Sequence, residues 1–284
     1  MATIRDLRGR IVAVQKTQKI TRAMKMVAAA KLARATRQIQ AARPYAEKLR
    51  QVVSAVAGGV ETDIHPLLQA RDEVRTLEIV LFTSDRGLCG AYNSNLAKLA
   101  RGIVDERAGS VSKILLTPVG RRGGGGFRRD RRVSMDHTFT GLGNVNPGQA
   151  REIADDLMRR YREGEVDEVI LVYSEFKSAL TQRPGQERLL PLQPEHVEDA
   201  AGYEIEPDPA RLLALLIPRA VEFAVYRALL ENQAGEHGAR MTAMDSATTN
   251  TEELIGKLTL DMNKARQAAI TAELVEIVSG AEAL

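Results

Sequence analysis

The sequence predicts an α/β fold, in which a small α/β domain is inserted between two long terminal helices that pair with each other. Residues 1–57 and 209–284 carry apolar residues at helical spacing, and short β-branched apolar runs occur only in the middle of the chain. A continuous helix over the last segment would be about 110 Å long. No compact domain can cover such a helix, so we expect the N-terminal segment to be its partner.

The N-terminal segment predicts a helix whose apolar side follows one heptad register at both ends of the segment. The members of that register are Ile4, Leu7, Ile11, Val14, Leu32, Ala35, Ile39 and Ala42. Between these two groups the register holds the polar residues Gln18, Thr21 and Lys25, and bulky apolar residues stand one position away, at Ile20, Met24 and Val27. We therefore expect the apolar stripe to drift around the helix.

Prolines and glycines mark the expected helix boundaries. Pro44 should kink or end the first helix, and Gly58-Gly59 should stop it. Pro207-Asp208-Pro209 forms a rigid entry to the last helix, in which Pro218 predicts a kink. Gly235 and Gly238 should weaken the middle of that helix.

The middle of the chain predicts a largely parallel sheet within an α/β domain over residues 75–195. Three buried strands are expected, with an edge strand after them and amphipathic helices near residues 92–107 and 147–163. The strand segments are Leu77–Thr83, Lys113–Val119, Glu168–Tyr173 and the edge segment Gln182–Leu192.

The charge distribution predicts an acidic partner for the N-terminal helix. Residues 1–50 hold 13 Lys and Arg against Asp6 and Glu47, a balance of +11, whereas the whole chain carries +3 and the remainder therefore carries 3 − 11 = −8. Nucleic acid and an acidic protein surface are both candidates. Nucleic acid is less favoured, because no aromatic residues suited to base stacking interleave the basic ones.

Composition also bears on the cellular compartment. Cys89 is the only cysteine, so no intrachain disulfide can form, which fits a reducing compartment. The first residues lack an apolar signal core, and no apolar run approaches the ~20 residues that span a bilayer. We expect any membrane association to go through a partner.

Features that resemble ligand sites are better explained without a ligand. Gly123-Gly124-Gly125-Gly126 lies among arginines but is followed by Phe127 instead of the Lys-Ser/Thr of a phosphate-binding loop, so we expect a flexible solvated loop. The four histidines (His65, His137, His196 and His237) show no metal-ligand spacing. We expect Cys89 to be a small, packed residue, and we expect Asp85 and Arg86 to form a surface ion pair.

Three separated segments resemble ATP synthase gamma subunits. The first is Ile4-Arg5-Asp6-Leu7-Arg8 with residues 17–28 (TQKITRAMKMVA), the second is residues 84–90 (SDRGLCG), and the third is residues 270–281 (ITAELVEIVSGA). The resemblance covers the whole chain, with the segments in the expected order. The Gly123–Gly126 run departs from the family pattern, in which bulkier charged residues are usual.

This resemblance implies an asymmetric antiparallel coiled coil of residues 1–57 and 209–284 with an inserted Rossmann-like α/β domain. It implies a rotor inside a ring of three alpha and three beta subunits, in contact with the epsilon subunit and a membrane ring of c subunits. The chain itself would be non-catalytic, with no cofactor, metal or nucleic acid. It would lie at the cytoplasmic face of a bacterial plasma membrane as a peripheral protein.

The resemblance also implies partner-contacting residues. The coupling positions of the family fall on Met24, Arg240, Gln267, Thr271 and Glu273, with Arg266 as a weaker member. The foot that faces the c ring falls on Tyr203 and Glu206. Simple packing within the coiled coil is the alternative for Met24 and Gln267.

Two other function classes remain open. The basic helix could bind nucleic acid, with affinity that falls steeply as salt rises. An enzyme site on the α/β domain would need convergent titratable groups at the strand ends, and the sequence indicates none.

Overall fold

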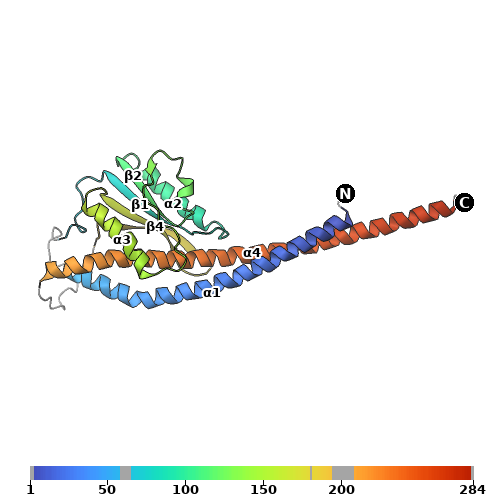
Figure 1. Ribbon diagram of the computed structural model, residues 1–284, viewed down its shortest axis with the longest axis horizontal. Coiled ribbons are helices and arrows are strands. Elements are labelled where there is room, and N and C mark those ends of the chain that lie inside the picture. Colours follow the sequence, from blue (N-terminus) through green and yellow to red (C-terminus); the bar gives the residue numbers. More distant parts are fainter. Residues whose placement is uncertain (1–2, 58–64, 180, 194–207, 283–284) are drawn as a thin grey trace. The chain divides into compact units, whose positions relative to one another are not determined.

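The computed structural model describes residues 3–57, 65–179, 181–193 and 208–282 (Figure 1). The chain forms two compact units, one made of Met1–Ala28 and Met241–Leu284 and the other of Ala29–Arg240. We call them the terminal unit and the domain unit. Helix α1 (Ile4–Ala57) and helix α4 (Pro209–Glu282) each contribute residues to both units.

Local capping explains where the two long helices begin. The Thr3 hydroxyl accepts a hydrogen bond from the Asp6 backbone N–H, and the Thr3 backbone N–H donates to the Asp6 carboxylate, each over 3.2 Å. Pro209 is the first residue of α4, where a missing N–H costs nothing. Contrary to one expectation, α1 does not end at Pro44, and it continues to Ala57. Gly58-Gly59 and Pro207 lie outside the described residues.

In the terminal unit the two helices pair antiparallel, as predicted. Leu7 and Ile11 of α1 form an apolar cluster with Leu258 of α4. Further along α1, Thr21 Oγ1 lies 2.8 Å from Thr248 Oγ1. Lys25 Nζ then lies 2.5 Å from the Asp245 carboxylate. Residue numbers rise along one helix as they fall along the other, which defines the antiparallel register.

The predicted drift of the apolar stripe around α1 is wrong. The buried residues of α1 keep one heptad register through its middle: Leu7, Ile11, Thr21, Ala28, Leu32, Ala35 and Ile39. The bulky neighbours that suggested drift point outward, with Ile20 60% and Val27 58% exposed. Thr21 can occupy the seam because its hydroxyl meets that of Thr248, and Ala28 can because it is small.

The domain unit contains the predicted α/β domain with its largely parallel sheet. The strand order is β3-β2-β1-β4-β5, with β4 and β5 antiparallel and the other neighbours parallel. Strands and helices lie close to their expected bounds, and only the short β3 was missed. The elements are β1 (Thr76–Phe82), α2 (Tyr92–Arg107), β2 (Lys113–Val119), β3 (Val133–Ser134), α3 (Pro147–Arg162), β4 (Glu168–Phe176) and β5 (Gln182–Leu190).

The sheet is buried on both faces because each of the two shorter helices covers one of them. Leu77, Ile79 and Leu81 of β1 pack with α2 in an apolar core. Glu78 points to the opposite face, where its carboxylate lies 2.7 Å from the Arg160 guanidinium of α3. Both side chains are almost fully buried, and Thr117 of β2 donates a hydrogen bond to Glu78.

The Gly123–Gly126 segment is solvated in part, as the sequence suggested, with Gly125 and Gly126 exposed, but it forms regular structure instead of a flexible loop. Gly124–Gly126 forms a 3₁₀ turn, and the Phe127 side chain is 1% exposed in the core. A side chain at Gly123 would place its Cβ 3.0 Å from the Thr83 hydroxyl oxygen. The Arg101 guanidinium donates to the Gly126 carbonyl over 3.2 Å. Tight packing on both sides therefore explains part of the glycine run.

The buried ion pair gives the first prediction. Arg160→Met leaves the Glu78 carboxylate buried without its cation, so we expect the free energy of unfolding to fall by about 3–5 kcal/mol. Arg159→Met is the matched control, because Arg159 is 45% exposed, and its partner Asp156 keeps a second cation, Arg160, when Arg159 is lost, so the loss should stay below about 1 kcal/mol. Urea unfolding of both variants checks this. Equal midpoints would mean that the buried pair contributes no more than the surface ones.

The threonine pair gives the second prediction. Thr21→Val or Thr248→Val alone removes the cross-helix hydrogen bond but leaves the other hydroxyl the backbone carbonyl of its own helix, Gln18 or Met244, so each should cost about 0.5–1.5 kcal/mol. The double variant should cost less than the sum of the two, because it removes both polar groups together. Thermal unfolding of the three variants measures this coupling. Strictly additive losses would show that the two hydroxyls do not stabilise each other.

Candidate functional site

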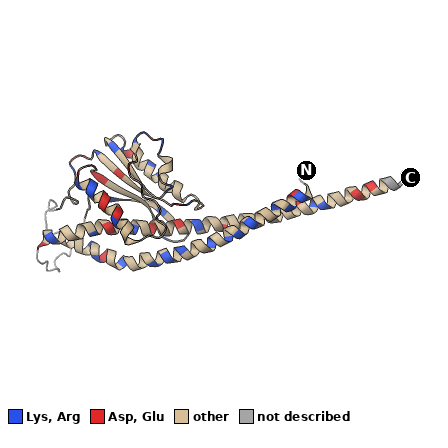
Figure 2. Ribbon diagram, viewed as in Figure 1, with Lys and Arg blue, Asp and Glu red and all other residues tan. Residues whose placement is uncertain are grey.

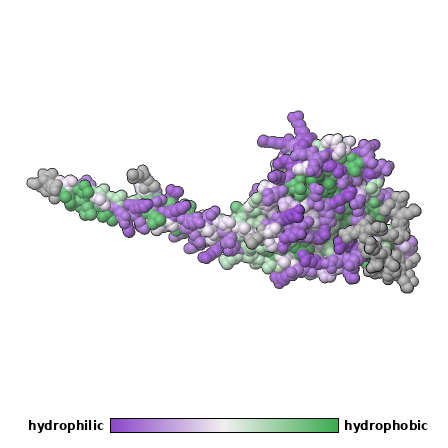
Figure 3. Space-filling model, turned by 180° about the vertical axis from the view of Figure 1, so that it is seen from behind, coloured by the Kyte–Doolittle hydropathy of each residue, from purple (hydrophilic) through white to green (hydrophobic). Residues whose placement is uncertain are grey.

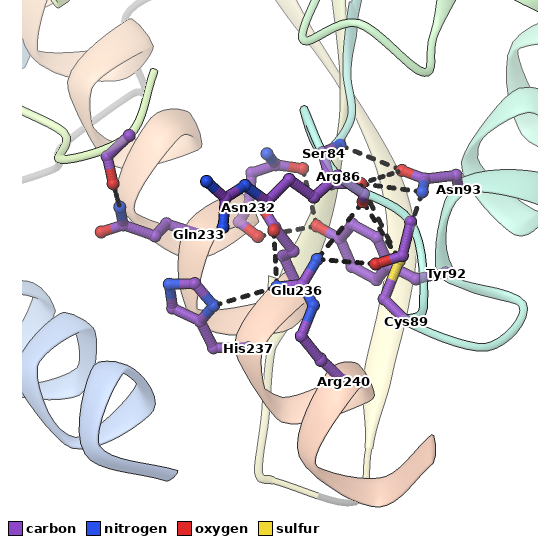
Figure 4. Close-up of polar contacts among 12 residues, drawn as sticks. Ser84, Arg86, Cys89, Tyr92, Asn93, Asn232, Gln233, Glu236, His237 and Arg240 are labelled. Carbon is purple, nitrogen blue, oxygen red and sulfur yellow. Dashed lines mark hydrogen bonds and ion pairs between the residues drawn. The ribbon is translucent and has the colours of Figure 1, made fainter. Parts of the chain in front are cut away.

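The most highly organised polar region of the described chain lies at the carboxyl end of β1, in residues 84–90 (Figure 4). We call this segment the β1 turn. The Ser84 backbone N–H donates to the Asn93 side-chain oxygen over 3.0 Å, and the Asn93 amide donates to the Ser84 hydroxyl over 2.8 Å. The same amide donates to Cys89 Sγ over 3.2 Å. Cys89 is buried, as predicted, and these bonds fix the turn to the start of α2.

The β1 turn holds one apolar side chain in solvent. Leu88 is 64% exposed and has φ 63°, a left-handed conformation that costs energy for a residue other than glycine. The Arg240 guanidinium of α4 donates to the carbonyls of Arg86 and Gly87, over 3.3 and 3.2 Å. The turn is thus held from two sides in a conformation that its own sequence does not favour.

Asp85 does not form the predicted surface ion pair with Arg86. Its carboxylate instead accepts hydrogen bonds from the backbone N–H groups of Arg121, Gly141 and Leu142, over 3.0–3.1 Å. These amides come from two different loops. Asp85 therefore joins the loops that follow β2 and β3 to the β1 turn.

Helix α4 meets this region through a buried asparagine. Asn232 is 4% exposed, and its side-chain amide donates to the Thr83 carbonyl over 3.2 Å. The Tyr92 hydroxyl donates to the backbone and side-chain oxygens of Asn232, over 2.8 and 2.6 Å. The next residue, Gln233, donates to the Gly143 carbonyl over 3.4 Å (Figure 4). A single segment of α4 therefore reaches the end of β1, the start of α2 and the loop after β3.

Two titratable side chains lie beside Arg240: Glu236 forms an ion pair with it, and His237 forms a hydrogen bond. Glu236 lies 2.7 Å from the Arg240 guanidinium, and burial raises the pKa of Glu236 although Arg240 opposes this. Burial lowers the pKa of His237 to about 4, and the charges of Arg240 and Lys31 act in the same direction. His237 is therefore neutral at pH 7, and its Nδ1 can accept from Arg240 Nη1 at 3.4 Å.

This arrangement can hold a loop in place, but it does not pair a nucleophile with a base. The Cys89 thiol faces an amide and a hydroxyl. Within residues 3–57, 65–179, 181–193 and 208–282, no group of three or more His, Cys, Asp or Glu is placed to hold a metal ion. No helix in those ranges is long and apolar enough to cross a membrane.

The structure separates the residues that the resemblance singled out. Arg240 belongs to the domain unit, and Met24, Arg266, Gln267, Thr271 and Glu273 belong to the terminal unit. Met24 is half-buried, whereas the four residues on α4 are exposed. Lys25 contacts Asp245, which is 22 residues before Gln267, so Met24 lies roughly 30 Å from that group along α4. Tyr203 and Glu206 lie outside the described residues.

The end of α4 carries a second candidate surface. The first residues of α1 pack near Leu258, and every described side chain from Thr271 to Ser279 is exposed. Large apolar side chains occur throughout this end of the helix (Figure 3): Ile270, Leu274, Val275, Ile277 and Val278, each 49–67% exposed. Such a concentration on one exposed helix is typical of a surface that another protein covers.

Asn232 and Tyr92 are functional candidates that the sequence reasoning missed. Asn232 interrupts an apolar helix face that includes Leu229 and Leu230. A polar residue inside such a face is a signal for a buried hydrogen bond. Its partners Thr83 and Tyr92 are distant in sequence, so the pairing itself could not be predicted.

The chain was compared with protein families and with known proteins. A family model described as ATP synthase matches residues 3–284. The ATP synthase gamma chain of Moorella thermoacetica is 52% identical over 287 residues, covering 100% of both chains. That of Chlorobium phaeobacteroides is 46% identical over 293 residues, covering 100% of this chain and 99% of the relative.

Solved structures give the same result for the fold. A chain in the central stalk and c-ring structure of Tetrahymena thermophila mitochondrial ATP synthase is 25% identical, with a TM-score of 0.60, over 80% of this chain and 99% of that one. A chain of the Euglena gracilis mitochondrial ATP synthase is 20% identical, with a TM-score of 0.69, over 99% and 94%. From the matching family model and the full-length relatives, we conclude that the chain belongs to the ATP synthase gamma chain family.

Proposed function

We propose that this chain is the central-stalk rotor subunit of a proton-translocating ATP synthase, which couples proton flow to ATP synthesis or hydrolysis without catalysing either step. Its partners are three alpha and three beta subunits, the epsilon subunit and the membrane ring of c subunits. It works at the cytoplasmic face of a bacterial plasma membrane and reaches the membrane only through those partners. Membership of the gamma chain family supports this role.

The observation that carries the proposal is the exposed apolar end of α4. A 74-residue helix whose last described side chains are exposed and apolar suits a shaft tip enclosed by other subunits. Apolar contacts are non-directional, so a tip can turn against them without breaking strong bonds. A helix that acted alone in water would expose such side chains unfavourably.

The exposed side of α1 suits an acidic neighbour. Ile20, Met26 and Val27 are 58–63% exposed, and they lie among the Lys and Arg residues that dominate this helix (Figure 2). A basic surface with apolar residues fits a partner that has both acidic and apolar groups. We assign this surface to the acidic loop of the beta subunits that the family resemblance implies.

Residue roles follow from exposure and position. Gln267, Thr271 and Glu273 are available to the surrounding ring, with Arg266 beside them, and Met24 lies on the paired part of the shaft. We assign Arg240 to coupling through the β1 turn that it holds. Tyr203 and Glu206 are assigned to the c ring on the resemblance alone.

The proposal predicts that the isolated chain does not hydrolyse ATP. The described residues bring together neither a phosphate-binding loop nor a nucleophile and its base. Mixed with alpha and beta subunits, the same chain should raise their ATPase activity and co-purify with them. Turnover by the pure chain that is lost on mutating one of its own residues would overturn the rotor assignment.

A truncation series of α4 tests the role of its exposed end. Removing residues 279–284 takes away little of the apolar tip, so the complex should assemble less tightly but still pump protons with ATP. Removing residues 266–284 also takes away Gln267, Thr271 and Glu273, and pumping should fail while some ATP hydrolysis continues. The measurement is proton pumping per ATP hydrolysed in complexes of equal subunit content. Complete loss of pumping with the shorter deletion would assign force transmission to the tip itself.

A further inference from the structure

One side of α4 is built to fit the α/β domain closely. Asn232 and Gly235 are three residues apart and lie on one side of the helix, and Arg240 lies further around it, about 80° from Asn232. All three meet residues that belong to the α/β domain. Gly238, a little further around α4, meets the segment before β5. We call these four residues the junction face.

The glycines of this face lie very close to their neighbours. A Cβ at Gly235 would lie 3.0 Å from the Tyr92 ring and 3.1 Å from the Ser174 hydroxyl oxygen. A Cβ at Gly238 would lie 3.1 Å from the Ala179 carbonyl oxygen. Gly256, on the same helix, has no neighbour within 4 Å of the corresponding position. The glycines that were expected only to weaken α4 therefore allow it to touch the domain.

Asn232 stabilises the same contact with hydrogen bonds that are buried. It is 4% exposed and Tyr92 is 5% exposed. The Thr83 carbonyl that accepts from Asn232 directly precedes the β1 turn, and Arg240 holds the carbonyls of Arg86 and Gly87 within that turn. Asn232 thus binds the residue directly before the β1 turn, and Arg240 binds the middle of the turn.

On another side of the domain unit, α1 borders a groove. A cavity of about 640 Å³ is lined by Leu49 and Val53 of α1, Arg188 of β5, and Phe223 and Leu230 of α4, among other residues. Atoms separated by such a space lose their dispersion contacts. Along this groove the residues of α1 therefore do not pack closely on β5.

We propose that force between the α/β domain and the coiled coil passes through the junction face of α4, with Asn232 as the positioning residue that keeps the face seated. This inference rests on the proposed rotor function. Helix α4 continues from Arg240 to Glu282 without a break, so a load applied at the junction face reaches the exposed end of α4 through one helix. α1 then stabilises the shaft by pairing with α4.

The first test is a pair of Gly→Ala substitutions in one helix. Gly256→Ala has room and improves helix propensity, so it should leave coupling unchanged. Gly235→Ala pushes against Tyr92 and should lower proton pumping per ATP hydrolysed, in complexes that assemble and still hydrolyse ATP. Asn232→Leu, which leaves the Thr83 carbonyl unpaired, should do the same, and Tyr92→Phe should have a smaller effect.

A second measurement reports on the junction without activity. Amide hydrogen exchange of residues 83–90 in the isolated chain should become about 5- to 30-fold faster in Asn232→Leu, the factor that corresponds to losing one buried hydrogen bond. Exchange in α3 should not change. Faster exchange together with reduced pumping per ATP supports the proposal and separates it from general misfolding, which would affect α3 as well.

The outcomes distinguish this inference from the rotor assignment. If the wild-type chain fails to restore coupled pumping to vesicles that contain all the other subunits of the synthase, the rotor function is wrong. If the wild type restores pumping and both Gly235→Ala and Asn232→Leu match it, the rotor function stands and the junction face carries no force. An equal loss in Gly256→Ala would also overturn the inference, because a Cβ at that position has no neighbour within this chain.

Discussion

The fold depends on burying one side of α4, because a helix of 74 residues has no core of its own and needs other elements to pack against it. In the terminal unit α1 covers it, with Leu7 and Ile11 packed on Leu258. In the domain unit the α/β domain approaches it so closely that a side chain at position 235 or 238 would push against a neighbour. Both solutions bury one side of α4 and leave the remaining surface for other subunits. The exposed apolar end is what remains where neither covering element reaches.

Polar groups inside these contacts define how the elements fit together. An apolar seam tolerates sliding, since neighbouring leucines are nearly equivalent, whereas the hydrogen bond between Thr21 and Thr248 forms in one register only. Glu78 and Arg160 similarly bind α3 to β1 in one position. Asn232 does the same between α4 and the end of β1. Each pair costs desolvation, so these contacts favour a unique arrangement more than they add stability.

Local signals in the sequence predicted the elements of the fold well. Buried strands such as Lys113–Val119 are short apolar runs, and the amphipathic helices between them show their period directly. The errors occurred where a distant partner changes what a residue can do. Thr21 looked like a gap in the seam until Thr248 supplied a hydroxyl, and the glycine run looked mobile until Phe127 and Thr83 packed around it. For the site, Arg240 was named from resemblance, but its bonds to the β1 turn depend on contacts 153 and 154 residues apart in sequence.

The continuity of the two helices connects the junction face to the coupling role. The boundary between the units falls after Ala28 on α1 and after Arg240 on α4, and both helices cross it without interruption. Arg240, the last residue of the domain unit, holds the β1 turn at this point. A residue so placed can influence coupling without touching any other subunit, because a change at Arg240 alters how firmly the α/β domain is held where α4 leaves it.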